Sequence, residues 1–311
     1  MTDVLSHAKA AIARGSKSFA LASRLFDAPT RDHAMLLYAW CRHTDDVIDG
    51  QVLGEGRNDD TRPPAERLAE VERLTELALA GTPEGDPAYH ALARVVHETG
   101  MPPQYPRDLI HGFRIDMEER PFHTLEDTLT YCYHVAGCVG VMMAIVMGVD
   151  PKDRATLVRA SDLGIAFQLN NIARDIIEDA MNSRRYIPDD WLANVGLTPT
   201  NFAFPAQRRQ LFRLLIRLVD QAEDYELSAR HGTPALRNRA AWAVLAAASI
   251  YGGIGRKLRK AGPEALESRM RTTMPEKLQA VSLAASQTLV RKRRWSGTHD
   301  RSGLWTMPDN A

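Results

Sequence analysis

Two pairs of aspartates stand four residues apart in segments with helical character. Asp45 and Asp49 belong to YAWCRHTDDVIDG, and Asp175 and Asp179 belong to QLNNIARDIIEDA. Residues four apart lie on one face of a helix, one turn from each other. Two carboxylates at this spacing can hold a hard cation such as Mg²⁺. The two pairs therefore predict acidic faces that meet across a helical bundle and bind a metal-bound diphosphate.

The second of these segments carries a longer polar stripe. Gln168 and Asn171 precede the two aspartates at steps of three and four residues, so amide and carboxylate groups follow one helical face. The opposite side is apolar, and burying such a stripe costs free energy unless a partner satisfies it. A bound metal ion is one such partner. A buried ion-pair network is the alternative, and Arg42 and Arg174 are the residues that could complete it.

A third pair with the same spacing, Asp220 and Asp224, has a different interpretation. Such a pair is expected by chance about once in a chain of this length. Glu223 and Glu226 surround it, which is typical of a charged, solvated helix face. We therefore interpret this pair as structural.

Other chemistries lack their motifs. The chain contains no H-E-x-x-H or E-x-x-H sequence for zinc or di-iron sites, and no P-loop. It also lacks the G-x-G-x-x-G fingerprint of a nicotinamide site. The short sequence GSKS places Ser16 and Ser18 where a turn at a helix N-terminus contacts phosphate, or where a serine simply caps the helix.

The composition is that of an ordinary globular protein. Of 311 residues, 44% are hydrophobic and 25% are charged, and the formal net charge is zero. A neutral chain has no general electrostatic footprint for nucleic acid, so we expect no nucleic-acid partner. No clear linker divides the sequence, which predicts one domain over residues 1–295 and a disordered tail at 296–311. The basic cluster RKRRW at 291–295 is expected to be solvated, with contact to anionic lipid as the alternative.

Cysteines and apolar runs indicate the compartment. Cys41, Cys132 and Cys138 have no metal-type spacing and cannot all pair, which indicates buried thiols in a reducing cytoplasm. The N-terminal segment lacks the apolar stretch of a signal peptide. The longest apolar run, residues 135–149, has 15 residues and is too short to cross a bilayer. We expect a cytoplasmic protein, with peripheral association at a membrane surface for product release as a further option.

Helical signals dominate the chain, and strand signals are nearly absent. The sequence therefore predicts an all-α bundle of about eight or more helices. Two segments, 135–149 and 240–254, are apolar around most of their circumference. This pattern suits central core helices or, because Gly, Ala and Met are frequent, the lining of an apolar cavity. The expected helices are 30–50, 65–80, 88–99, 104–119, 124–147, 151–180, 206–230, 234–260 and 275–291.

Four strings of the sequence together resemble the squalene/phytoene synthase family: GSKSF, YAWCRHTDDVID, YCYHVAGCVG and QLNNIARDIIEDAMNSRRYIP. The resemblance implies an all-α, single-domain isoprenoid-synthase fold with a central apolar cavity. It also implies a prenyltransferase that condenses two geranylgeranyl diphosphates head to head, through prephytoene diphosphate, to phytoene in carotenoid biosynthesis. The implied cofactor is Mg²⁺ or Mn²⁺. No NADPH is expected, because proton loss rather than hydride capture completes the reaction.

The resemblance also assigns roles to individual residues. The metal ligands would be Asp45, Asp49, Asn171, Asp175 and Asp179, and the four aspartates together with Tyr131 would serve catalysis. Substrate contacts would come from Ser16, Ser18, Arg42, Gln168, Asn171, Arg185, Tyr186, Tyr251 and Arg269. The string VAGCVG has Cys138 where the family usually has threonine, which is a small change.

Two other functions remain open from the sequence. A squalene or dehydrosqualene synthase that uses farnesyl diphosphate is the nearest rival inside the family, because cavity depth sets the prenyl chain length and the sequence does not display that depth. A non-catalytic helical protein for lipid binding or assembly is the alternative from another class. The presence of all four motif aspartates favours an enzyme.

Overall fold

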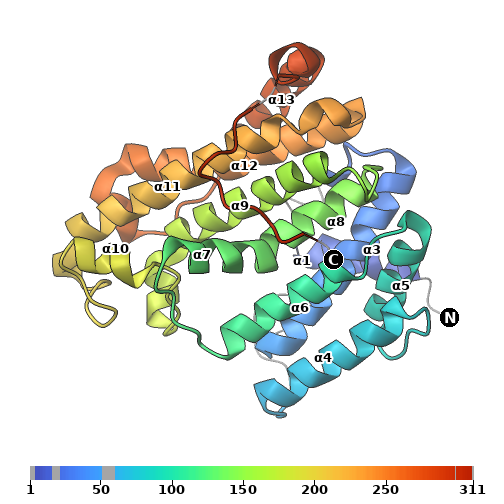
Figure 1. Ribbon diagram of the computed structural model, residues 1–311, viewed down its shortest axis with the longest axis horizontal. Helices are drawn as coiled ribbons and strands as arrows, with labels where there is room; N and C mark the ends of the chain where they lie inside the picture. Colours follow the sequence, from blue (N-terminus) through green and yellow to red (C-terminus); the bar gives the residue numbers. More distant parts are fainter. Residues whose placement is uncertain (1–3, 16–21, 51–59, 298, 310–311) are drawn as a thin grey trace.

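The computed structural model describes residues 4–15, 22–50, 60–297 and 299–309, and the regular elements in these ranges are all helical (Figure 1). The all-α expectation is confirmed. The α-helices are α1 (Val4–Gly15), α3 (Ala28–Asp49), α4 (Pro64–Leu79), α5 (Pro87–Thr99), α6 (Gln104–Met117), α7 (Leu125–Cys132), α8 (Cys138–Val146), α9 (Arg154–Met181), α10 (Asp189–Asn194), α11 (Arg208–Arg230), α12 (Asn238–Ala261) and α13 (Met274–Arg294). A π-helical turn, η1 (Tyr133–Gly137), joins α7 to α8, and 3-10 turns form η2 (Pro205–Gln207), η3 (Thr233–Ala235) and η4 (Gly262–Glu267).

Each expected helix is present, and most of its ends lie within a few residues of the prediction. The structure adds α1 and α10, which were not predicted. The start of α9 also differs, because Pro151 lies in the preceding turn and the helix begins at Arg154. There the Asp153 carboxylate accepts a hydrogen bond from the Thr156 N–H at 3.1 Å. A capping aspartate satisfies a free N–H at the helix start, which proline cannot do.

Helix α3, which carries the first acidic pair, has local signals at both ends. The Asp27 carboxylate accepts a hydrogen bond from the Thr30 N–H at 3.0 Å, and Pro29 occupies the first turn. At the other end Gly50 adopts a left-handed conformation with φ of 68°, which glycine tolerates without strain. The helix therefore ends directly after Asp49, as predicted.

Helices α7 and α8 form, with η1 between them, a continuous stretch of 22 residues. It opens with the predicted capping box, in which Thr124 and Asp127 satisfy each other's backbone N–H groups. Within the described ranges it is the one stretch long and apolar enough to cross a bilayer, but 61% of its most apolar window is buried inside the protein. This stretch is therefore a core helix here.

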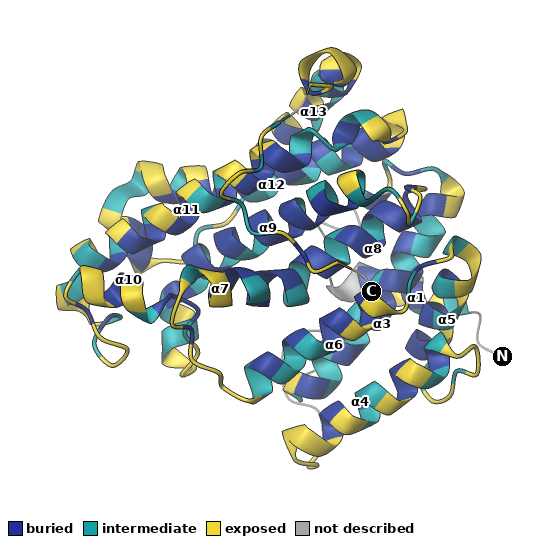
Figure 2. Cartoon of the chain, in the orientation of Figure 1, coloured by how far each residue is buried: buried dark blue, intermediate teal, exposed yellow. Residues whose placement is uncertain are grey.

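Helix α9 lies at the centre of the bundle, between α8 on one side and α11 and α12 on the other (Figure 1). Its middle is buried, whereas exposed residues concentrate on outer helices such as α4 and α13 (Figure 2). Glycines allow α8 and α9 to pack closely. A Cβ on Gly164 would clash with the Ala136 backbone, and one on Gly140 with the Ala160 backbone. This close packing sets α9 beside η1 and holds its polar stripe in place.

The C-terminal residues 299–309 pack against the core, which contradicts the expectation of a disordered tail for this part. They cross α12 and α9 in Figure 1. Arg301 pairs at 2.6 Å with Asp162 of α9, which is only 1% exposed. The Trp305 N–H donates to the Tyr225 hydroxyl at 2.8 Å, and Met307 is buried. The sequence lacked a signal for this order because every partner is distant in the chain.

The three cysteines are unpaired, as expected. Cys132 and Cys138 are buried, and Cys41 is partly buried. Burial raises the pKa of the Cys41 thiol to about 12, with a smaller effect from Asp45. These thiols therefore act as small apolar side chains at neutral pH.

Candidate functional site

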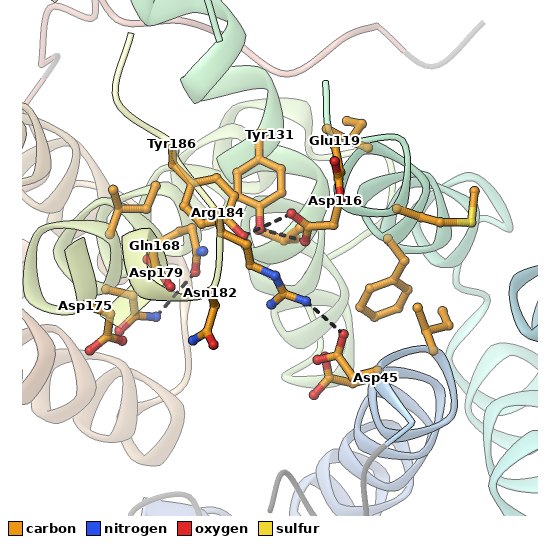
Figure 3. A pocket seen from close by; sticks show the side chains of 18 of the residues that line it. Asp45, Asp116, Glu119, Tyr131, Gln168, Asp175, Asp179, Asn182, Arg184 and Tyr186 are labelled. Atoms are coloured by element: carbon orange, nitrogen blue, oxygen red, sulfur yellow. Dashed lines mark hydrogen bonds and ion pairs between the residues drawn. The ribbon is translucent and has the colours of Figure 1, made fainter. Parts of the chain in front are cut away.

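A cavity of about 1020 Å³ lies between α3, α4, α6, α7, η1, α8, α9 and the segment that follows α9 (Figure 3). Its volume is at the upper end of the range for ligand pockets. Most of the residues that the sequence marked for chemistry line it, although they come from motifs far apart in the chain. We therefore treat this cavity as the candidate active site.

The two acidic pairs lie on different walls of this cavity. Asp45 and Asp49 project from α3, and Asp175 and Asp179 project from α9. Figure 3 shows Asp45 across the cavity from Asp175 and Asp179. This is the facing arrangement that the spacing predicted.

Arginines contact the pair on α3. Arg42, one turn earlier on the same helix, binds Asp45 at 2.6 Å. Arg184, from the segment after α9, reaches Asp49 at 3.2 Å. The pKa of Asp45 is nevertheless raised to about 6, because burial and the neighbouring Asp49 carboxylate outweigh the effect of Arg42.

The pair on α9 is unevenly neutralised. Asp175 binds Arg174, and Arg269 reaches it at 2.8 Å. Burial acts to raise the pKa of Asp175, but these two arginines lower it overall. The Asp179 carboxylate has no ion-pair partner in the described part of the chain, and burial and Asp175 raise its pKa to about 7. The ion-pair network that the sequence left open is thus present, but it leaves Asp179 without an ion pair among the described residues, and Arg184 only partly offsets the rise in its pKa.

The polar stripe of α9 is also exposed to the cavity. Gln168 and Asn171 both line it, and the Asn171 amide donates to the Gln168 carbonyl oxygen at 3.3 Å. The carbonyl oxygen of Asn171 is buried and lacks a hydrogen-bond partner among the described residues. A buried acceptor of this kind needs a donor or a cation.

These groups fit a divalent metal ion that is shared with a substrate phosphate. Across the described ranges no three His, Cys, Asp or Glu side chains converge into a ready metal cage. Mg²⁺ seldom uses such a cage, because it is usually held by one or two carboxylates together with phosphate oxygens. Asp45 and Asp179, one carboxylate of each pair and each with a raised pKa, supply hard oxygen donors of this type together with the unsatisfied Asn171 oxygen.

A cluster of two tyrosines and one aspartate forms another wall. Tyr131 and Tyr186 stack with ring centroids 4.7 Å apart, and Phe122 meets both rings edge-on. Both phenols donate to Asp116 at the end of α6, Tyr131 at 2.8 Å and Tyr186 at 3.0 Å. Burial raises the pKa of Asp116, although the two phenols and Arg184 oppose the shift. Figure 3 shows the three side chains and Arg184 directed toward one another.

The apolar lining comes mainly from α6, and of the two alternatives for the apolar segments the core-helix one holds for most of their residues. Leu109 and Phe113 of α6 line the cavity, together with Val135 and Val139. The apolar segment 135–149 contributes only these two valines, and no residue of 240–254 lines the cavity. The small residues of α12 serve helix packing instead, since α12 packs against α9, α11 and α13.

The remaining predicted residues differ in position. Arg185 lines the cavity and pairs with Asp189 at 2.9 Å. Tyr251 does not line it and instead stacks on Phe167 at 4.3 Å. Arg269 also lies outside the lining but touches the site through Asp175. Ser16 and Ser18 lie outside the described residues.

Sequence reasoning missed two central residues, Asp116 and Arg184. Asp116 lies in the string FRIDM, where it interrupts an apolar helix face, and this interruption is the signal that could have marked it. Arg184 stands beside Arg185, and the sequence had no basis for choosing between adjacent arginines. The fold makes the choice by directing Arg184 to Asp49 and Arg185 to Asp189.

The pair Asp220 and Asp224 is structural, as interpreted. Arg259 of α12 binds Asp220 at 2.9 Å and Glu223 at 2.8 Å on the protein surface. Asp224 is exposed. Neither aspartate lines the cavity.

Solved structures have the same fold. A dehydrosqualene synthase in complex with ligand superposes with a TM-score of 0.80, at 28% identity, over 91% of this chain and 95% of that chain. The squalene synthase HpnC from Alicyclobacillus acidocaldarius has a TM-score of 0.73 at 22% identity, over 83% of this chain and 94% of that chain. The expectation of an isoprenoid-synthase fold is confirmed.

Curated sequences are more similar still. The 15-cis-phytoene synthase of Pantoea ananas is 48% identical, over 94% of each chain. That of Enterobacter agglomerans is 49% identical over 94% of this chain and 99% of its own length, and that of Paracoccus sp. is 44% identical over both full lengths. The model of the squalene/phytoene synthase family matches residues 12–276. The chain belongs to the squalene/phytoene synthase family.

Proposed function

We propose that this protein condenses two geranylgeranyl diphosphates head to head, through prephytoene diphosphate, to phytoene with release of two diphosphates. The observation that carries the proposal is the single cavity in which two facing acidic pairs and several arginines adjoin an apolar wall. Relatives named phytoene synthase, at 44–49% identity over nearly the whole chain, support the twenty-carbon substrate over farnesyl diphosphate.

The polar end would hold and activate the diphosphate. Asp45, Asp49, Asp175, Asp179 and Asn171 would bind Mg²⁺ or Mn²⁺, which when bound neutralises the charge that develops on the departing diphosphate. Arg42, Arg184 and Arg185 would add fixed positive charge to the same group, and Gln168 a hydrogen bond. The proposed diphosphate contacts of Ser16 and Ser18 remain predictions. Tyr251 and Arg269 do not line the cavity, so they would contact the diphosphate from outside its lining.

The apolar part would protect the allylic cation. Apolar side chains of α6, η1 and α8 would exclude water that would otherwise capture it. The stacked rings of Tyr131 and Tyr186 present π-electron density to the cavity, and an aromatic face attracts a cation. Asp116 holds both phenols in place. Proton loss then forms the product, so the reaction needs no nicotinamide cofactor.

We also propose a single catalytic domain in a cytoplasmic protein that associates with the membrane surface. Substrate and product carry long hydrocarbon chains that partition into lipid. No nucleic-acid partner is proposed for a chain with zero net charge.

The test is an incubation with geranylgeranyl diphosphate and Mg²⁺ or Mn²⁺, without NADPH, followed by extraction of the hydrocarbon. The expected product is a forty-carbon polyene with release of inorganic diphosphate, abolished by EDTA. A thirty-carbon product from farnesyl diphosphate alone would keep the mechanism and overturn the substrate. No diphosphate release from either substrate would favour a non-catalytic lipid-binding or assembly protein.

A further inference from the structure

Helix α13 presents its large apolar side chains to solvent, the reverse of the usual pattern for a surface helix. The face that packs against α12 is built from small residues, which include Ala280, Ala284 and Thr288. Five of the eight large apolar side chains that are exposed in the described part of the chain belong to this helix. They are Met274, Leu278, Leu283, Leu289 and Val290.

The position of α13 makes this face accessible. The helix lies at the edge of the molecule, beyond α12, and its surface is largely exposed (Figures 1 and 2). Leu289 is 85% exposed and Leu278 is 57% exposed. Single exposed leucines are common, but the helical period of 3.6 residues places Met274, Leu278 and Leu289 along one side of α13, and an exposed apolar stripe of this kind marks an interaction surface.

The charge on this helix has one sign. From residue 277 to residue 295 the chain contains no Asp or Glu. Glu276, in the first turn, is paired with Lys257 at 3.0 Å. At the other end the Lys-Arg-Arg sequence at 292–294 is exposed. Apolar and cationic side chains without acidic ones are the composition of a helix that lies on an anionic lipid surface.

The helix is held rigidly on the bundle. Arg291 is buried, so the expectation of a solvated basic cluster is wrong for this residue. Its guanidinium donates to the Leu236 carbonyl at 2.9 Å and to the Asn238 side chain at 2.8 Å. The Trp242 indole donates to the Val281 carbonyl at 2.8 Å. Binding through this preformed face would therefore require no folding step.

The start of α13 is close to the candidate active site. Arg269, which contacts Asp175 in the cavity wall, precedes Met274 by five residues. Five residues span at most about 18 Å. A lipid surface that covers the N-terminal end of α13 would therefore lie within reach of the site where substrate binds.

We propose that the outer face of α13 docks this protein onto an anionic lipid bilayer. Met274, Leu278 and Leu289 enter the boundary between headgroups and acyl chains, and residues 292–294 bind the anionic headgroups. A second copy of the chain is a poorer occupant. In an isologous contact this face would meet itself, and its one acidic side chain, Glu276, is already paired with Lys257, so the exposed cations at 292–294 would find no free acidic partner.

The experiment measures co-sedimentation of the full chain with vesicles of phosphatidylcholine alone and of phosphatidylcholine with phosphatidylglycerol. We expect binding to the anionic vesicles, weakened by high salt. The Lys292→Glu/Arg293→Glu variant should lose binding by at least about tenfold, since each basic residue contributes roughly a fivefold factor at such a surface. The Leu278→Ser/Leu289→Ser variant should also bind several-fold more weakly.

Matched control variants distinguish binding through this face from nonspecific adsorption to lipid. Phe204→Ser removes an apolar side chain that is 59% exposed elsewhere, and Arg209→Glu/Arg213→Glu reverses two exposed charges on α11. Both controls should bind as the wild type does. Equal losses in variants and controls, or no wild-type binding to anionic vesicles, would overturn the proposal. A lipid-free dimer that the α13 variants dissociate would identify a second copy as the occupant instead.

Vesicle binding needs no substrate, so its outcome is independent of the proposed reaction. A second readout connects the two. With geranylgeranyl diphosphate in detergent micelles, the α13 variants should retain wild-type turnover. With the same substrate in anionic vesicles, their turnover should fall in proportion to binding.

Discussion

Replacement of Asp116 by asparagine tests the site most sharply. The carboxylate accepts hydrogen bonds from Tyr131 at 2.8 Å and from Tyr186 at 3.0 Å, and both tyrosines are nearly buried. The Asp116→Asn side chain keeps the shape but loses the charge. Its single carbonyl oxygen faces one phenol, whereas its NH₂ group faces the other. The stacked pair of rings should therefore lose its fixed position.

The magnitude follows from the bonds that change. Hydrogen bonds to a charged group contribute about 1.5–3 kcal/mol each, and a neutral one contributes about 1 kcal/mol. Relief of the buried charge at Asp116 offsets part of the loss, so we expect the free energy of unfolding to fall by about 2 kcal/mol. For a chain of this size that lowers Tm by about 3 °C. Displacement of Tyr131 should lower kcat by about 10- to 100-fold.

Asp108 provides a matched control on the same helix. Its buried carboxylate also accepts a hydrogen bond from a tyrosine, Tyr133, and a second from Gln104 at 2.6 Å. It lines a different hollow, on the other side of α6, and not the candidate active site. Asp108→Asn should therefore lower Tm by a similar amount and leave kcat near that of the wild type.

The assay is turnover of geranylgeranyl diphosphate at a temperature well below both transitions, with Tm measured by circular dichroism. A kcat loss specific to Asp116→Asn supports a role in positioning Tyr131. If both variants lost activity in proportion to Tm, or if neither lost any, the assignment of Asp116 to the site would be refuted.

Three further predictions concern other parts of the fold. Asp179→Asn should nearly abolish turnover yet leave Tm equal or higher, because it removes a negative charge that has no ion-pair partner among the described residues; a lower Tm together with retained turnover would contradict this. Gly164→Ala should cost about 1–3 kcal/mol in chemical denaturation because its Cβ meets backbone, whereas Gly253→Ala, which meets nothing, should not destabilise. Arg301→Met should cost about 3 kcal/mol, measured in the same way, because it removes the ion-pair partner of buried Asp162, which keeps only a hydrogen bond from Ser228 and the nearby charge of Arg159; wild-type stability would show that the C-terminal contact is dispensable.

Helix positions were predictable wherever their signals were local. The capping box at Thr124 and the glycine at Gly50 set helix ends through groups within four residues, so the sequence displays them directly. The start of α9 was predicted three residues too early. Pro151 and Asp153 are both typical of a helix start, and in the structure the helix begins directly after Asp153, which caps it. Order in residues 299–309 was not predictable, because Asp162 and Tyr225 lie more than a hundred and about eighty residues away respectively.

The residues of the candidate site also fall into two groups, those that local sequence patterns reveal and those that only the fold brings together. Asp45 with Asp49 and Asp175 with Asp179 could be found because helical geometry puts residues four apart on one face. Asp116 and Arg184 could not be found in this way. Their roles depend on the packing of the end of α6 and of the segment after α9 against other parts of the cavity wall. Composition left open whether segments 135–149 and 240–254 are core helices or line a cavity, and only packing decides. Segment 240–254 forms helix contacts, whereas 135–149 is a core segment that also contributes two valines to the cavity.

The chemistry of the two acidic faces, the all-α architecture and the family were determined by the sequence alone, because each depends on residue type and short-range periodicity. The tertiary structure decided which arginine meets which aspartate, that Asp116 holds two tyrosines, that residues 299–309 pack on the core, and that α13 turns its leucines outward. These features depend on contacts between distant segments. Their free energies appear only when the whole bundle has brought those segments together.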